Sequence, residues 1–251
     1  NNAALVGTSV SALTGANGDV ALVLGTTDGS SSGSGGSGGF AGTFDWNNSG
    51  TITSVPPSNP CTAAVCSFAN TYVSTNSNTG RYTLQMLGTP NASPAGPPIP
   101  FVLYAAGADY GFLLDQSSSA VMTGTMNAQS APKANLGNFS ASSATGTYAV
   151  ATNSNSVINP SACSSLTSCY TTMNLLLTSP GASVFNVTGT ENPGSQAVSL
   201  PYTLGSDGTG TIGPASNQKT PNYVIYAVTE DDFFVMGLDA GVVSPILYMA
   251  Q

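Results

Sequence analysis

Short apolar runs separated by turn-forming residues make up most of this chain. Runs rich in Val, Leu, Tyr, Phe and Thr alternate with clusters of Gly, Asn, Ser and Pro. This pattern is typical of antiparallel β-sheet proteins, and helical periodicity is nearly absent. The alternation is clearest in residues 81–87, where Tyr82, Leu84 and Met86 fall on one face of an extended strand.

The same pattern predicts about eight strands in each half of the chain. In the first half they lie near residues 19–26, 40–46, 51–55, 68–75, 81–87, 101–106, 111–116 and 120–127. In the second half they lie near residues 146–151, 170–178, 183–190, 196–204, 209–212, 223–228, 233–238 and 242–249. The near-continuous apolar runs 101–106 and 233–238 predict central strands covered on both faces.

One stretch of sequence occurs twice. Residues 101–129 read FVLYAAGADYGFLLDQSSSAVMTGTMNAQ, and residues 223–251 read YVIYAVTEDDFFVMGLDAGVVSPILYMAQ. The two align without a gap and share the identical pairs Val102/Val224, Tyr104/Tyr226, Ala105/Ala227, Asp109/Asp231, Phe112/Phe234, Val121/Val243, Ala128/Ala250 and Gln129/Gln251. We therefore expect an all-β protein of two tandem antiparallel β-barrel or β-sandwich units, about eight strands each, related by an internal repeat.

The repeat also predicts the domain organisation. We expect a first β unit over residues 13–129, a linker over residues 130–143 and a second β unit over residues 144–251. The preceding residues 1–12 have strand-like apolar positions at Ala4, Leu5, Val6 and Val10. They have two interpretations: an arm that completes the sheet of a neighbouring copy by strand addition, or a segment that folds back onto its own unit.

Charge is sparse along the whole chain. There are three Lys and Arg residues against eleven carboxylates, giving a net charge of −8. Nucleic-acid binding needs clustered cations, so we expect no nucleic-acid partner. The sequence contains no run of 18 apolar residues, so we expect no membrane span. A surface of hydroxyls and amides suits an extracellular protein that packs against copies of itself.

The four cysteines form two local pairs, Cys61 with Cys66 and Cys163 with Cys169. Each pair follows an Asn-Pro dipeptide in a corresponding part of its repeat. A metal site built from all four thiolates is one interpretation, but zinc knuckles favour two to four intervening residues within each pair. These pairs have four and five, with nearly a hundred residues between them. We therefore favour two short disulfide loops in a secreted protein, and no metal site.

Several short motifs resemble those of a tandem β-repeat in uncharacterised secreted proteins of acidobacterial type. The motifs are Leu13-Thr14-Gly15, residues 40–45 with residues 48–53, Gly80-Arg81-Tyr82-Thr83-Leu84, Phe101-Val102-Leu103-Tyr104 and Phe112-Leu113-Leu114-Asp115. They are similar to consensus stretches G-F-x-A-D-G-x-G-x-I-T, G-R-G-T-L-T-L and F-x-F-Y with a terminal Q. Trp46 and Asn47 depart from that consensus, which has Gly there. The resemblance implies secretion, β structure and tandem arrangement, and it implies no established activity.

Candidate chemistry is scarce. The chain has no histidine, which excludes Ser-His-Asp triads and histidine metal sites. Asp109 with Asp115 offers a formal carboxylate pair, as do Glu230, Asp231 and Asp232, but Asp in hairpin tips is more often a turn residue. We therefore expect no enzyme, no catalytic residues and no cofactor.

The function we expect is structural. It is an extracellular subunit that polymerises into a pilus-like filament or a surface layer, in part through strand addition by the N-terminal arm. The alternative is a secreted carbohydrate- or small-ligand-binding β-barrel, whose pocket aromatics such as Trp46 and Tyr104 would line.

The cysteine pairing gives a first prediction. Intact-mass measurement after alkylation should show unmodified protein, and alkylation after reduction should add four alkyl groups, because each pair forms a bond. Proteolytic mapping should find the bonds Cys61–Cys66 and Cys163–Cys169. Four alkylations without reduction, or a stoichiometric zinc ion, would contradict the pairing.

Overall fold

Every regular element that the structure describes is a β-strand. The computed structural model describes residues 7–15, 19–28, 36–48, 51–53, 67–76, 79–87, 99–107, 110–117, 121–130, 138–140, 142, 144, 146–152, 172–177, 185–191, 194–200, 202–213, 223–237 and 247–250. No helix occurs in these ranges. The all-β prediction is therefore confirmed for the described chain, which divides into two compact units with the boundary between Gln129 and Ser130.

The first unit contains nine strands. They are β1 (Gly7–Gly15), β2 (Val20–Thr27), β3 (Ser37–Asn48), β4 (Thr51–Thr53), β5 (Ser67–Asn76), β6 (Arg81–Met86), β7 (Ile99–Ala105), β8 (Tyr110–Asp115) and β9 (Met122–Ala128). All eight strands predicted from the sequence of this unit are present, with ends that differ by a few residues.

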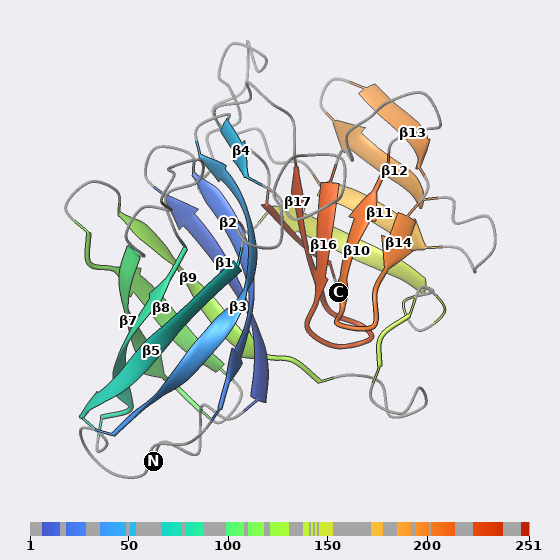
Figure 1. Ribbon diagram of the computed structural model, residues 1–251. Coiled ribbons are helices and arrows are strands. Elements are labelled where there is room, and N and C mark those ends of the chain that lie inside the picture. Colours follow the sequence, from blue (N-terminus) through green and yellow to red (C-terminus); the bar gives the residue numbers. More distant parts are fainter. Residues whose placement is uncertain are drawn as a thin grey trace. The chain divides into compact units, whose positions relative to one another are not determined.

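Eight of these strands close into an antiparallel barrel (Figure 1). Neighbours in the sheet follow the order β1, β2, β3, β5, β6, β7, β8 and β9, and β9 then pairs with β1. The short β4 extends the sheet beside β3 without entering the ring. Closure matters because it pairs the backbone groups that a sheet edge would otherwise leave open to other chains.

The strand that closes the barrel is β1, which corrects the assignment of residues 1–12 to a separate arm. Val10 lies opposite Leu24 of β2 and Asn127 of β9, so β1 pairs on both sides within its own unit. Val10 is fully buried. Residues 7–12 therefore follow the second interpretation, folding back onto their own unit, whereas Ala4, Leu5 and Val6 lie outside the described residues.

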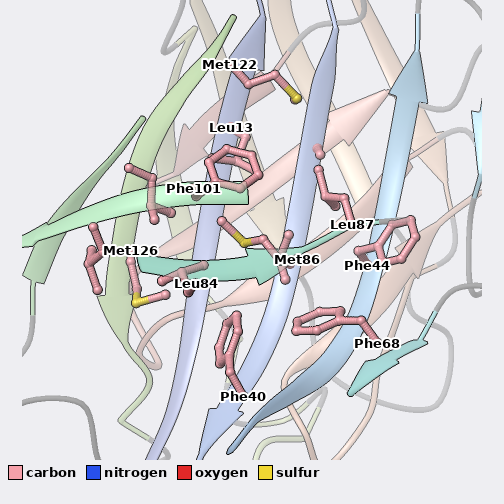
Figure 2. Close-up of a cluster of buried hydrophobic side chains, with 14 of the residues drawn as sticks. Leu13, Phe40, Phe44, Phe68, Leu84, Met86, Leu87, Phe101, Met122 and Met126 are labelled. Atoms are coloured by element: carbon pink, nitrogen blue, oxygen red, sulfur yellow. The ribbon is translucent and has the colours of Figure 1, made fainter. Parts of the chain in front are cut away.

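Side chains on the inward face of each strand fill the barrel interior. In β6, Tyr82, Leu84 and Met86 are buried, as the sequence pattern predicts, and Gln85 is exposed. The interior cluster also receives Phe40 from β3 and Phe101 from β7 (Figure 2). Large rings fit because small residues face them.

Gly25 of β2 shows this fit most directly. A Cβ atom at this position would overlap the ring of Phe40. Phe40 itself packs against Phe68 with ring centroids 5.1 Å apart. The packing of Phe40 in the interior thus depends on a glycine in the neighbouring strand.

The second unit is built from β10 (Gly146–Thr152), β11 (Thr172–Leu177), β12 (Phe185–Glu191), β13 (Gly194–Leu200), β14 (Tyr202–Leu204), β15 (Thr209–Ile212), β16 (Tyr223–Ala227), β17 (Phe233–Gly237) and β18 (Leu247–Ala250). These nine strands form one antiparallel sheet in the order β13, β12, β11, β10, β18, β17, β16, β15 and β14. The predicted strand 196–204 corresponds to β13 and β14 together.

Corresponding hairpins of the two units share register and turn hydrogen bonds. Phe101 lies opposite Asp115 in β7–β8. The residues 122 positions later, Tyr223 and Gly237, lie opposite each other in β16–β17. The Ala105 N–H donates to Gly80 O at 2.9 Å, and the Ala227 N–H donates to Gly208 O at 2.8 Å. Both glycines have positive φ, 63° and 83°. The β8–β9 register differs from that of β17–β18, so the likeness covers the first hairpin of the repeat.

The described residues of the predicted linker pack on the second unit. The Ser130 N–H donates to Val228 O at 2.8 Å, and the Phe139 N–H donates to Ser206 O at 3.2 Å. Phe139 is buried. This part of the chain therefore belongs to the body of the second unit.

Filling the Gly25 site is expected to destabilise the first unit. Gly25→Ala should lower its free energy of unfolding by about 1–3 kcal/mol, because the added methyl group forces Phe40 to move within a packed interior. Trp46, the chain's single tryptophan, lies in this interior, so its fluorescence during denaturant titration reports this unit.

The matched control is Gly107→Ala. Gly107 is exposed, and a Cβ atom there would meet nothing within 4 Å. Its change should stay within about 0.5 kcal/mol. Equal effects of the two substitutions would contradict the packing role of Gly25.

Candidate functional site

The barrel interior is the first place where a ligand could bind, and the described interior is occupied by the protein's own side chains. Buried aromatic rings meet across it, including Tyr72 and Tyr82 with centroids 6.3 Å apart. Aliphatic and Met side chains fill the space between the rings, among them Leu13, Met86 and Met122 (Figure 2). Such packing is that of a core and not of an open binding cavity.

The two aromatic residues predicted to line a pocket do not meet. Trp46 lies in the interior cluster and is 4% exposed. Tyr104 lies on the outer face of β7 and is 46% exposed. The buried indole N–H of Trp46 has no hydrogen-bond partner among the described residues. An unpartnered buried donor costs about 1–3 kcal/mol. The buried hydroxyls of Ser11 and Ser74 are unpartnered in the same way among the described residues, so Trp46 is not singled out as a ligand-binding group.

The candidate carboxylates serve as turn residues where the structure describes them. Asp115 is buried at the end of β8 and accepts hydrogen bonds from the backbone N–H and the hydroxyl of Ser117. The backbone N–H groups of Asp231 and Asp232 donate to Thr229 Oγ1, each at 3.1 Å. Asp109 lies outside the described residues.

No group of three or more Cys, Asp or Glu side chains gathers closely enough to hold a metal ion in the described ranges. All four cysteines, Cys61, Cys66, Cys163 and Cys169, lie outside these ranges. Their pairing remains a prediction.

Among the described residues of the second unit, Tyr148 of β10 is a strongly perturbed titratable group. Burial raises the pKa of Tyr148 from 10.0 to about 12, and the nearby charges of Asp231 and Glu230 add to the effect. Its hydroxyl donates to Ala144 O at 3.0 Å and lies 3.3 Å from Glu230 O. Its ring meets Phe233 edge-on at 5.0 Å. This tyrosine ties the segment before β10 to the β16–β17 turn, which is a structural role.

An exposed apolar surface lies on the outside of the first barrel. We define the β7–β8 patch as Tyr104, Tyr110, Phe112, Leu114 and Val121, which are 39–58% exposed. Tyr104 lies directly opposite Phe112, and Leu114 lies opposite Val102, which is buried. The run 101–106 was predicted to be covered on both faces, and this patch corrects that prediction for its outer side.

The patch is about as large as the largest apolar patch on a typical monomer. With aromatic side chains of about 200 Å² each, the exposed fractions give a patch of roughly 400 Å². The largest apolar patch on a typical monomer spans about 300–600 Å² and is often functional. Sequence patterns predicted residues 101–106 to be covered on both faces and Tyr104 to line a pocket, so they did not identify this surface.

Comparison with models of known families and with curated proteins found no match. Among the described residues, no helix is long and apolar enough to cross a membrane.

The raised pKa of Tyr148 makes the second unit sensitive to alkali. The folded state holds the proton more tightly than the unfolded state, so this contribution is complete below pH 10 and is lost as pH rises to about 12. A shift of this size corresponds to at most about 3 kcal/mol.

Tyr148→Phe tests this pH dependence of stability. Phenylalanine cannot ionise, and the wild type and the variant share all other tyrosines. The stability advantage of the wild type over the variant, measured by urea titration, should narrow between pH 10 and pH 12. An advantage that stays constant over this range would contradict the assignment.

Proposed function

We propose that this chain is an extracellular structural protein whose copies associate into a filament or a surface layer. The observation that carries the proposal is the contrast within the first unit between a filled interior and an exposed apolar outer face. A protein that leaves little room inside its barrel presents its functional surface on the outside. The sparse charge of the chain agrees, because few like charges oppose contact between identical neighbours.

The mode of contact that we propose is side by side. β1 is already paired on both sides, so residues 7–12 would have to leave their own barrel to enter a neighbour's sheet. Losing the burial of Val10, Ala12 and Leu13 would oppose that exchange. Contact between outer faces needs no such opening.

We further infer that the second unit is a second copy of the same barrel, which makes the protein a tandem of related units. Only Pro201 separates β13 from β14 in sequence, and these strands stand at opposite ends of the sheet order. β5 of the first barrel changes partner in the same way: its residues 67–73 pair with β3 and its residues 72–76 pair with β6. Counting residues 194–204 as one bent strand gives the second unit the same circular order of eight.

A secreted carbohydrate- or small-ligand-binding barrel is the second candidate. The buried, unpartnered indole N–H of Trp46 is compatible with it. The packed rings around Trp46 count against it, because a ligand would have to displace core side chains.

Association should be visible without any variant. Electron microscopy of the native material should show filaments or sheets built from this chain, and sedimentation of the purified protein should show species larger than the monomer as concentration rises. Apolar outer faces that meet gain free energy from burial, which drives this association. A protein that stays monodisperse and monomeric at high concentration would contradict the proposed function.

A further inference from the structure

We propose that the β7–β8 patch is the contact surface for a second copy of this chain. The inference rests on the proposed self-association and names the surface that mediates it. Comparison of the β7–β8 hairpin with its repeat β16–β17 indicates that the partner is another copy of this chain.

The patch has a structural counterpart in the second unit. Because β7–β8 and β16–β17 share register, Tyr104, Phe112 and Leu114 correspond to Tyr226, Phe234 and Met236. Two of the three positions carry the same aromatic residue in both copies, and the third stays apolar. The outward-facing chemistry is therefore the same in both units.

Burial distinguishes the two copies. Tyr104, Phe112 and Leu114 are 46%, 52% and 44% exposed, whereas their counterparts Tyr226, Phe234 and Met236 are 1%, 3% and 0% exposed. The face of β16–β17 that carries these residues is therefore buried, whereas the equivalent face of β7–β8 is exposed. The β7–β8 face is equally apolar but stays exposed within one chain. We infer that protein side chains from a second copy cover it.

The surroundings of the patch allow identical copies to meet. The outward positions of β6 and β9 beside it are mostly polar and uncharged, such as Thr83 and Gln85 of β6 and Thr123 and Thr125 of β9. Arg81, opposite Tyr104, is the single charged residue on the outer face of the described β6–β9 strands. A neighbouring copy that contacts this face therefore meets few charges, and a polar rim around an apolar centre is the usual anatomy of an interface.

The area also fits. A patch of roughly 400 Å² is about half of the 800 Å² that each partner contributes to a standard interface. The patch therefore suits the apolar centre of a contact, with the flanking threonines as its rim.

The ring geometry favours a protein partner over a polysaccharide. Tyr110 and Phe112 meet edge to face, with an interplanar angle of 84° and centroids 5.0 Å apart. A flat sugar chain stacks on rings whose faces are presented together, which this perpendicular pair does not offer. Leu114 and Val121 add aliphatic surface, which a protein side chain fills well.

The test compares two double variants of the full chain by sedimentation over a concentration series. Phe112→Ser with Leu114→Ser removes the centre of the patch. Thr26→Ser with Thr71→Ser alters exposed residues of β2 and β5, strands that do not neighbour β7 or β8. The patch variant should associate at least about tenfold more weakly than the wild type, and the control variant should match the wild type. Circular dichroism and Trp46 fluorescence establish that each variant is folded. If the first double variant does not fold, the single variant Phe112→Gln takes its place.

The outcomes separate this inference from the proposed function. If the wild type associates and the patch variant associates equally well, the patch is not the interface, although self-association stands. A wild type that remains monomeric at every concentration overturns both. Pull-down with insoluble cellulose and chitin provides a further arm: retention of the wild type and loss of the patch variant would make the patch a polysaccharide platform and overturn the inference.

Discussion

Pairing of β1 with β9 is the interaction on which the first unit depends. These are the first and last strands of the unit, separated by more than a hundred residues, and seven residue pairs join them. With that ladder in place the sheet closes, and every strand of the ring has two neighbours. Closure then fixes which face of each strand is inside, because side chains alternate strictly along a strand.

The filled interior follows from this constraint. An eight-stranded barrel is just wide enough for side chains to fill, so each large ring needs space from a neighbour. Phe40 obtains that space over Gly25, and Tyr72 obtains it over Gly38. The same closure leaves the outer face as the place where the chain can vary its chemistry without losing the fold.

Sequence patterns predicted the strands well where one face is buried and the other is not. β6 alternates between buried and less buried positions, and β15 coincides with the predicted range 209–212. β1 was not placed in the unit. Val10, Ser11, Ala12 and Leu13 are all buried, so this strand lacks the alternation of buried and exposed positions that marks a half-buried strand. Its membership depends on pairing with β9, a long-range contact that local pattern cannot reveal.

The candidate surface was harder to predict for the same reason. Residues 101–106 and 233–238 look alike in sequence, and both were expected to be covered on two faces. The prediction holds for Phe233–Gly237, which is buried throughout, and fails for Tyr104. The polarity of successive residues shows which side chains share a face of a strand. Whether the outer face is covered depends on which other residues pack against it. The exposed β7–β8 patch could therefore be found only from the structure.

A closed barrel also restricts how such a protein can associate. Proteins with open edges join through backbone hydrogen bonds, which any strand of suitable length can supply. In the first unit the ring strands are already paired, so contact between copies through the ring would pass through side chains on its outer face. Selectivity then comes from the shape and apolar character of a small area and not from the backbone.

Because the described outer face around that area carries a single charge, Arg81, burial and not charge pairing would supply the free energy of contact. The strength of such a contact would change little with salt of moderate concentration.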